Sequence, residues 1–329
     1  MSRSRLNVCR GGALALALLA SGLALADEVR DWLRDMSEAA QNLNYRGTFV
    51  YLHNGQIGAM RIFHRAAADG EQERLVALTG EAREVLRDQE HVTCILPKSK
   101  SVMVDRSVPR KPFPASLPRD LGALDDNYEF LSLGEDRISG LPSRMVEIRP
   151  RDAYRYGYRL WLERDSKLLL RSDLIDTGGQ AVEQMMFTEV EIVDSLDDRD
   201  LEPMLRGEDY TWVGHRNGGE EDDADGETVN GGDWSAAWLP PGFMLAQRSR
   251  HPMPSDLAEV EHLVFTDGLA TVSVYVEPET PDKEPLSGHS SMGAVNAHGS
   301  RSGDYRITVV GEVPRTTVER IGASMRRHP

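Results

Sequence analysis

The residues of this sequence that could carry out chemistry are rarely grouped as a reaction requires. There is no Gly-x-Ser-x-Gly elbow, His-Glu-x-x-His pair, P-loop, Gly-x-Gly-x-x-Gly turn or Cys-x-x-Cys motif. His289, Ser290, Ser291 and His298 are close in sequence, which would suit a serine nucleophile with a histidine base. No orienting acid accompanies them, so we interpret the Gly/Ser/His-rich stretch 287–303 as a loop. The sequence predicts a protein that is not an enzyme, with an esterase as the catalytic alternative.

Metal and thiol chemistry are also poorly supported. Asp222, Asp223 and Asp225 lie in a dense acidic run, but they lack the spacing and the distal Glu of a calcium loop. Cys94 is the single cysteine after residue 26, so it has no partner for an internal disulfide. Polarity alternates around it at 91–96, which predicts a buried thiol on a strand. We predict no metal and no cofactor.

One group of basic residues contrasts with the acidity of the chain. Six of them surround a proline-rich loop at 108–118: Lys98, Lys100, Arg106, Arg110, Lys111 and Arg119. Their ammonium and guanidinium groups suit the phosphate or carboxylate of a ligand. The alternative is a solvated loop whose charge is neutralised by neighbouring acids.

The N-terminus has the pattern of an export signal. Three arginines within the first ten residues precede an apolar run at 13–26, shorter than the roughly 20 residues that span a bilayer. The run ends in Ala24-Leu25-Ala26, the A-x-A pattern of a cleavage site, so the predicted mature chain begins at Asp27. We expect an exported protein, with an uncleaved membrane anchor as the alternative.

Export also changes the charge of the chain. The sequence has 38 basic and 53 acidic residues, a net charge of −15. Without the three arginines of residues 1–26, 35 basic residues stand against 53 acidic ones, a net charge of −18. Nucleic acid and bare anionic membrane are repelled at long range by so acidic a surface, so neither is expected as the main partner.

Hydrophobic periodicity predicts one long helix followed by many short strands. Between Val29 and Leu43 apolar residues recur every three or four positions, which places them on one helix face. The period then changes to two. Ten strands are predicted, at 47–53, 58–64, 74–78, 84–87, 91–96, 128–133, 144–149, 156–164, 168–176 and 182–193. We therefore expect an α+β fold whose main part is a large unclosed antiparallel β-barrel wrapped on helices.

A smaller unit follows an acidic segment that has no apolar periodicity. Leu263–Val276 predicts a β-hairpin with Asp267-Gly268 at its turn. Thr316 and Glu319 have the spacing of a capping box ahead of a final helix. We expect four segments: a signal peptide at 1–26, a large half-barrel domain at 27–207, an acidic linker at 208–233 and a small C-terminal α+β domain at 234–329.

Several motifs, taken in their order and spacing, resemble the RseB/MucB family of regulators of an envelope-stress sigma factor. They cover nearly the whole mature chain: Leu43–Tyr51, Gly80–Val85, Tyr128–Phe130 with Gly134, Arg151-Asp152, Arg155–Tyr158, Trp238–Phe243, Thr266–Leu269 and Val309–Pro314. The long acidic linker departs from the family pattern and puts the interdomain geometry in doubt.

The resemblance implies a large domain like the lipoprotein carriers LolA and LolB and a small C-terminal domain. Together with the export signal, the resemblance implies a protein of the periplasm. It also implies that the chain binds the periplasmic domain of a transmembrane anti-sigma factor and shields it from proteolysis. Lipopolysaccharide or the acyl chains of lipoproteins would bind in the open barrel and so end this inhibition. The small domain would carry much of the contact with the anti-sigma factor. A periplasmic lipoprotein or lipid carrier is the alternative, which the second domain disfavours. The sequence leaves a homodimer open.

The motifs of the small domain and the strands of the barrel supply the candidate site residues. Those expected to face the protein partner are Trp238, Pro240, Pro241 and Phe243, with a core-forming entry segment as their alternative role. Those expected to bind lipid are Phe49, Tyr51, Tyr156, Tyr158 and Trp161, together with Arg110 and Lys111 near the lipid phosphates. Because side chains alternate along a strand, not all of these aromatic residues can point into the barrel.

Overall fold

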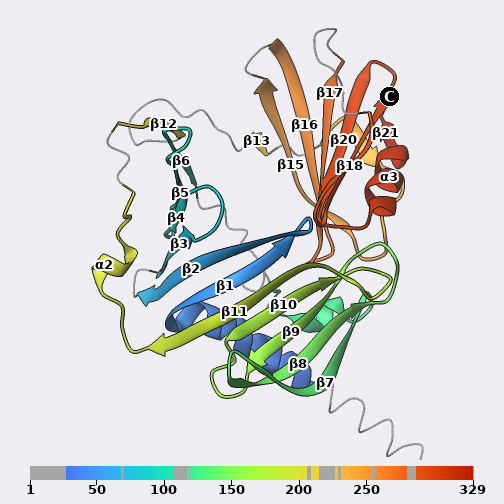
Figure 1. Ribbon diagram of the computed structural model, residues 1–329. Coiled ribbons are helices and arrows are strands. Elements are labelled where there is room, and N and C mark those ends of the chain that lie inside the picture. Colours follow the sequence, from blue (N-terminus) through green and yellow to red (C-terminus); the bar gives the residue numbers. More distant parts are fainter. Residues whose placement is uncertain are drawn as a thin grey trace, which may run out of the picture.

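The computed structural model describes residues 27–67, 70–106, 117–118, 120–205, 209–214, 227–228, 231–253, 256–279 and 287–328. The expected signal peptide, Arg110 and Lys111 of the proline-rich loop, and the acidic run with Asp222, Asp223 and Asp225 lie outside these residues. Two β-sheets dominate the described chain, and the C-terminal sheet stands against one side of the N-terminal sheet (Figure 1). No described helix has both the length and the apolar character that crossing a membrane requires.

The N-terminal sheet has twelve strands in the order β12-β6-β5-β4-β3-β2-β1-β11-β10-β9-β8-β7. Its strands are β1 (Asn44–His53), β2 (Gln56–Ala67), β3 (Gly70–Ala77), β4 (Glu84–Arg87), β5 (His91–Leu96), β6 (Ser101–Arg106), β7 (Tyr128–Ile138), β8 (Leu141–Pro150), β9 (Gly157–Glu163), β10 (Leu169–Ile175), β11 (Ala181–Val193) and β12 (Thr211–Gly214). All pairs are antiparallel except β12 with β6, and the edge strands β12 and β7 do not pair with each other. This confirms the predicted unclosed barrel.

One face of this sheet, which we call the inner face, holds the N-terminal helix at residues 27–42. Val29, Leu33 and Met36 of the helix are fully buried against residues of β7 to β10 and against the short helix η1 (Leu121–Leu124). Strand register extends the same face across the sheet, because Leu160 pairs with Ser172, Ser172 with Met185, and Met185 with Tyr51. The predicted helix therefore fills one half of the sheet and leaves the other half open.

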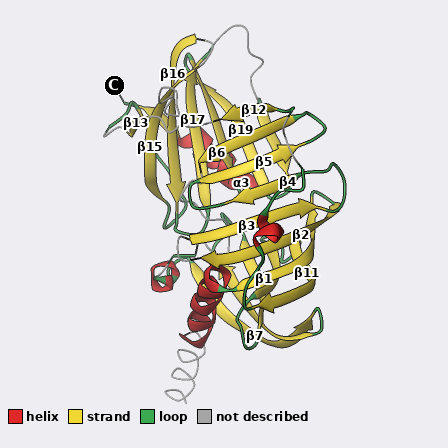
Figure 2. Cartoon of the chain, turned by 90° about the vertical axis from the view of Figure 1, so that its left-hand side faces the viewer, coloured by secondary structure: helices red, strands yellow, loops and turns green. Residues whose placement is uncertain are grey.

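The half beyond β2 forms a wing, which we define as β3 to β6 together with β12. Its outer face is covered by residues 196–205, which include the short helix α2 (Asp198–Leu201) (Figure 2). Arg74 forms a buried ion pair with Glu84 at 3.3 Å and donates to the backbone carbonyl of Asp200 at 3.0 Å. The amide of Met204 donates to Glu84 at 3.0 Å, so the covering segment is fixed to the wing.

The C-terminal sheet has seven strands in the order β13-β15-β16-β17-β20-β19-β18. They are β13 (Glu227–Thr228), β15 (Met244–Met253), β16 (Asp256–Thr266), β17 (Thr271–Pro278), β18 (Gly288–Met292), β19 (Val295–Ser302) and β20 (Tyr305–Gly311). Helix α3 (Arg315–Ser324) packs on one face through Val318 and Ile321, beside the small sheet of β14 (Trp234–Ala236) and β21 (Met325–Arg327). The predicted hairpin is confirmed, because β16 and β17 pair around the Asp267-Gly268 turn.

Two local expectations were wrong. Residues 287–303 do not form a loop, because β18 and β19 make a hairpin and β19 also pairs with β20. Ser290 and His298 sit on neighbouring strands, and Ser290 pairs with Ala297 rather than with a histidine. The capping box is absent as well, since Pro314 is the N-cap of α3 and Glu319 pairs with Arg315 at 2.7 Å.

Candidate functional site

The two sheets meet at a contact that we call the joint, which is built around the segment at 152–158. Arg155 is fully buried there and forms an ion pair with the buried carboxylate of Asp267 from the β16–β17 turn. Its guanidinium also pairs with Asp152 at 2.9 Å and donates to the backbone carbonyl of Pro241 at 2.6 Å. The Tyr128 hydroxyl donates to Asp267 at 2.9 Å. One arginine thus links three segments of the chain across the two halves.

The charges of this network are compensated. Burial alone would lower the pKa of Arg155, but the carboxylates of Asp267 and Asp152 outweigh it and raise that pKa. Burial and the Asp267 carboxylate raise the pKa of Tyr128 well above its ordinary value. The second oxygen of Asp267 accepts the amides of Leu269 and Ala270 at 2.9 and 2.8 Å. The Asp-Gly turn therefore closes its own hairpin and also receives the arginine of the other half.

A second contact of the joint lies between two hairpin tips (Figure 1). Glu183 of β11 is 2.7 Å from Nδ1 of His53 and accepts the amide of Ala294 at 2.9 Å. Gly293, between β18 and β19, has φ +60°, and a Cβ there would lie 2.4 Å from His53. Only glycine fits so close an approach without strain. Nearby, the Asn296 amide donates to the Tyr156 hydroxyl at 3.1 Å.

A third contact joins the start of α3 to Tyr154. The Thr317 hydroxyl donates to the backbone carbonyl of Tyr154 at 2.7 Å. The Trp238 ring meets Tyr154 edge to face at 5.1 Å between centroids, and the Arg320 guanidinium lies 3.9 Å from the Trp238 centroid. Arginine over an aromatic face adds a cation–π attraction to the packing.

The four residues expected to face the partner lie at or behind this joint. Trp238 and the carbonyl of Pro241 contact the N-terminal half, as described above. Pro240 is buried, and Phe243 is 7% exposed in the core of the C-terminal sheet. The structure thus places this segment where the two halves meet, with Pro241 exposed and Trp238 half-buried.

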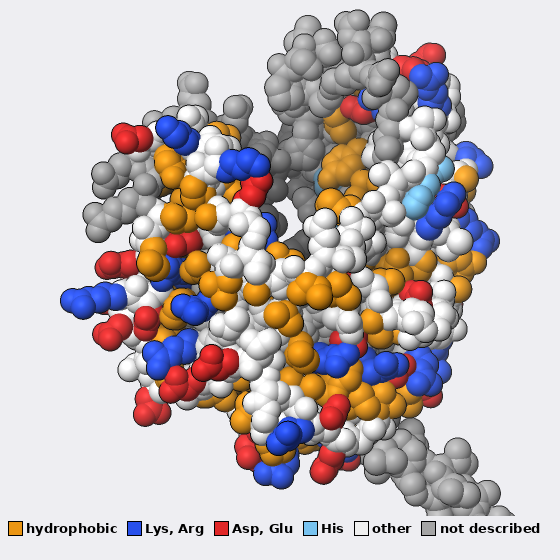
Figure 3. All heavy atoms as spheres, viewed as in Figure 1, with side chains coloured by type: hydrophobic (Ala, Val, Ile, Leu, Met, Phe, Trp, Pro, Cys, Tyr) orange, Lys and Arg blue, Asp and Glu red, His pale blue; other side chains and the backbone are white. Residues whose placement is uncertain are grey.

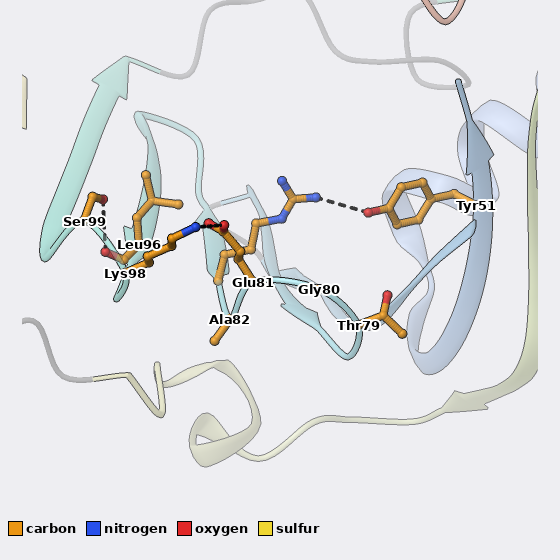
Figure 4. A pocket seen from close by; sticks show the side chains of 9 residues that line it. Tyr51, Thr79, Gly80, Glu81, Ala82, Leu96, Lys98 and Ser99 are labelled. Atoms are coloured by element: carbon orange, nitrogen blue, oxygen red, sulfur yellow. Dashed lines mark hydrogen bonds and ion pairs between the residues drawn. The ribbon is translucent and has the colours of Figure 1, made fainter. Parts of the chain in front are cut away.

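Beside Tyr51 the wing has a half-open pocket of about 660 Å³. The β3–β4 loop at 79–83 and the β5–β6 turn with Leu96, Lys98 and Ser99 complete its lining (Figure 4). Arg83 donates to the Tyr51 hydroxyl at 3.4 Å, and Lys98 forms an ion pair with Glu81. The volume lies within the usual range for small-molecule sites, and the lining offers two cations next to aromatic and aliphatic surface.

The inner face of the wing continues this surface with a row of apolar residues. Along paired strands the row runs through Leu75, Val85, Cys94, Met103 and Val213. Met103 is 50% exposed and Val213 is 53% exposed, so the row is open to solvent at its outer end. The space-filling view shows a hollow between the wing and the C-terminal sheet (Figure 3). This wall suits an elongated apolar ligand or an extended segment of a partner.

The aromatic residues expected to bind lipid are divided between three places. Phe49 and Tyr51 lie on the inner face, where their strand partners are Phe187 and Met185. Tyr158 also points to the inner face, but with Tyr156 it lies next to the joint. Trp161 lies on the outer face, 5% exposed and bonded to Asp136 at 2.8 Å.

No group of three or more metal-ligating side chains is arranged to hold an ion among the described residues. Cys94 is half-buried in the row on the wing, and burial raises the pKa of its thiol. The thiol therefore has little thiolate character at neutral pH, which fits a packing role in this wall.

Comparison with known proteins gives a family for both halves of the chain. Residues 28–205 match the model of the MucB/RseB N-terminal domain, and residues 228–326 match that of the MucB/RseB C-terminal domain. The chain belongs to the MucB/RseB family. A relative named sigma factor AlgU regulatory protein MucB, from Pseudomonas aeruginosa, is 33% identical over 94% of each chain. The sigma-E factor regulatory protein RseB of Escherichia coli K12 is 26% identical over 89% of each chain.

Solved structures of MucB extend the similarity to the fold. A crystal structure of MucB in complex with MucA(peri) has a TM-score of 0.68 and 29% identity, covering 91% of this chain and 98% of that one. A MucA/MucB complex of Pseudomonas aeruginosa has a TM-score of 0.69, with 30% identity over 92% and 99% of the chains. A further crystal structure of MucB has a TM-score of 0.61 over 92% and 98% of the chains. The TM-scores against the two MucA/MucB complexes are higher than this value.

Sequence reasoning identified the family motifs but missed what some of them do. The sequence predicts lipid binding for Tyr156 and Tyr158 and a hairpin turn at Asp267-Gly268, and both segments also form the joint. His53, Glu183 and the Gly293 tip were not predicted as functional residues. A signal did exist for the tip, because Met292 and Val295 flank a Gly-Ala pair as in a two-residue hairpin turn.

Proposed function

We propose that this chain binds the periplasmic domain of a transmembrane anti-sigma factor, shields it from proteolysis and so holds back an envelope-stress sigma factor. The observation that carries the proposal is similarity over both halves to MucB solved with MucA(peri). The curated relatives are named as regulatory proteins, which supports a binding role rather than an enzymatic one.

The structure supports a partner site between the wing and the C-terminal sheet. Figure 3 shows a hollow between the wing and the C-terminal half, and the inner face of the wing carries the exposed apolar row. Through its buried charges the joint fixes the position of these two walls relative to each other, so a partner segment meets a preformed site. In this proposal Trp238 and Pro241 affect partner binding indirectly, because they help to hold the two halves together at the joint. Pro240 and Phe243 pack in the core behind it.

Shielding from proteolysis follows from the same geometry. A protease needs its substrate segment extended and accessible. A segment held in the hollow buries the bonds that the protease would cut.

Lipid release is the second part of the proposal, and it rests on the pocket beside Tyr51. The apolar wall of the wing stabilises acyl chains by about 0.8 kcal/mol for each buried CH₂ group. Arg83 and Lys98 provide charge for a phosphate, with Arg110 and Lys111 of the proline-rich loop as further cations. Lipid and the anti-sigma segment then compete for one site or for one conformation, and the coupling between them must be reciprocal.

The experiment that tests the proposal uses residues 27–329 and the anti-sigma periplasmic domain encoded in the same genome. We expect saturable binding by calorimetry and slower cleavage of the anti-sigma domain by its protease as this protein is added. An anti-sigma domain whose apolar segment is replaced by Gly/Ser serves as the control. Absence of binding, with cleavage unchanged, would reject the regulator.

A periplasmic lipid or lipoprotein carrier is the second candidate, favoured by the open 660 Å³ pocket alone. It predicts retained binding of lipid together with no binding of the anti-sigma domain.

Export and assembly complete the proposal. We infer that the chain works in the periplasm after cleavage before Asp27, which intact-mass measurement of protein from the periplasmic fraction checks. Analytical ultracentrifugation of the same protein distinguishes a monomer from a homodimer.

A further inference from the structure

The outer edge of the wing is formed by β12, which has only a slight hold on the rest of the sheet (Figure 1). It has four residues, and all four are exposed. Its pairing with β6 is parallel, whereas the other described pairs of this sheet are antiparallel, and parallel pairing is slightly less stable per residue. On the other side, β5 pairs with all six residues of β6. β6 is therefore held firmly on one side and weakly on the other.

The end of β12 lies very close to the backbone of β6. Gly214 has φ +117°, and a Cβ there would lie 1.8 Å from the carbonyl oxygen of Val104. A side chain at this position would push β12 away from β6. The register ends at Val104, so Asp105 and Arg106 of β6 have no partner on this side among the described strands. β12 thus covers part of the β6 edge, through a contact that depends on one glycine.

We propose that the edge of β6 is a binding site for an extended polypeptide segment of the partner, and that β12 is a removable strand that occupies this site in the free protein. The inference rests on the proposed function, because the anti-sigma domain supplies the segment. It adds the form of the contact, which is strand pairing on the wing with displacement of β12.

The two faces of β6 specify the side chains that the segment needs. Pairing places Val213 beside Met103 on the inner face and Trp212 beside Val102 on the outer face. Met103 is half exposed, so an apolar residue next to it extends the row of the wing. Val102 is fully buried, so the residue that replaces Trp212 must keep water away from it. The segment that fits has a large apolar side chain on the outer face and a smaller one on the inner face.

A longer segment gains more from this edge than β12 does. β12 pairs with four residues of β6, whereas an antiparallel segment of the partner pairs with all six, as β5 does on the other side. Backbone hydrogen bonds at the edge provide affinity, and the alternating side chains provide specificity. β12 has the advantage of belonging to the same chain, which gives it a high effective concentration at the edge. A partner therefore displaces β12 when its side chains fit both faces.

A disulfide tests whether β12 has to leave. Met103 and Val213 are direct strand partners, so Met103→Cys with Val213→Cys brings two thiols within bonding distance in a Cys94→Ser background of residues 27–329. The oxidised form keeps β12 on β6, and reduction of the same protein frees it. We expect the oxidised form to bind the anti-sigma periplasmic domain about tenfold more weakly than the reduced form, because its β6 edge is never vacant. Equal affinities would overturn the proposal.

Hydrogen exchange shows which segments change. In the unsubstituted protein, binding of the anti-sigma domain should slow amide exchange at 101–106 and speed it at 209–214, because one strand replaces the other. Slower exchange in both segments would mean that the partner packs over β12, which contradicts displacement.

The same measurement without a partner separates this inference from the proposed function. Amides at 101–106 should exchange about threefold faster in the reduced disulfide variant than in the oxidised one, because β12 then leaves β6 part of the time. Equal rates would show that β12 does not leave. If the anti-sigma domain fails to bind at all, the proposed function is wrong, and this comparison still decides whether the edge opens.

Gly214→Ala approaches the question without a disulfide. Its Cβ displaces β12 from Val104, so affinity for the anti-sigma domain should rise about threefold. Gly231→Ala is the matched control, because Gly231 has a similar φ of +107° but no atom within 4 Å of its Cβ. A Gly214→Ala protein with an unchanged circular dichroism spectrum and no gain in affinity over Gly231→Ala would count against a removable β12.

Discussion

The joint and the wing use the same sheet in opposite ways. At the joint, Arg155 and the side chain of Asp267 are fully buried and every described charge has a partner at hydrogen-bond distance. On the inner face of the wing, Met103 and Val213 are about half exposed. The outer face of the same wing is covered by residues 196–205. The charges of the joint are therefore paired within the chain, whereas the inner face of the wing presents apolar surface to solvent.

This difference indicates that the joint fixes the geometry of the two halves and that the wing binds ligands. A buried ion pair adds little net stability, but it is costly to break and so favours one geometry over others. Exposed apolar surface contributes nothing to folding until something covers it. We therefore expect substitutions in the joint to change stability and substitutions in the wing to change ligand binding.

The largest effect is expected from Arg155→Ala. It leaves the Asp267 carboxylate buried without its cation, which typically costs about 3–5 kcal/mol. Urea denaturation followed by tryptophan fluorescence measures this loss. Arg164→Ala breaks an exposed pair with Asp165 and should change the unfolding free energy by less than about 1 kcal/mol. Equal losses for the two variants would erase the distinction between the joint and the surface.

A smaller loss of stability is expected from Gly293→Val at the hairpin tip. A branched side chain there must adopt positive φ and also displace His53, which costs about 1–3 kcal/mol. Gly303→Val has nearly the same φ, +61°, but its Cβ meets no atom within 4 Å. The difference between the two unfolding free energies isolates the contact between the halves from the backbone strain.

In the wing, Tyr51→Ala with Lys98→Ala should weaken binding of an anionic amphiphile about tenfold and leave stability nearly unchanged. The pocket loses an aromatic wall and one of its cations. Fluorescence titration with short-chain lipopolysaccharide measures the affinity, and Trp161→Phe on the outer face is the control. Unchanged affinity in the double variant would move the lipid site away from this pocket.

The smallest change in stability is expected from Met103→Glu, within about 0.5 kcal/mol, because the side chain is half exposed. The same substitution puts a charge into the apolar row and should weaken both lipid and anti-sigma binding severalfold. Thermal unfolding and calorimetric titration of one preparation give both values. A large loss of stability without loss of binding would reverse the roles assigned to the two regions.

Local patterns predicted the large sheet well. The bounds of β4 and β5 agree with the predicted strands at 84–87 and 91–96, because alternating polarity there is framed by turn residues. The stretch at 287–303 was misread because its Gly, Ser and His content resembles a loop. Its pairing with β20 and its contact with Glu183 are decided by residues elsewhere in the chain.

The joint shows why the site could be predicted only in part. Arg155 and Asp267 are 112 residues apart, and each has a sufficient local explanation, as a motif residue and as a turn residue. Nothing in either local pattern specifies that the two are partners. Similarly, strand alternation puts Trp161 and Tyr158 on opposite faces of β9, but the face that the helix covers depends on the register of the neighbouring strands.

The most direct test of the account is a competition experiment. Residues 27–329 are titrated with the periplasmic domain of the anti-sigma factor from the same genome, with and without saturating lipopolysaccharide. The account predicts tight binding that lipid weakens, and an equal weakening of lipid binding by the anti-sigma domain. Binding of the anti-sigma domain that saturating lipid leaves unchanged would contradict it.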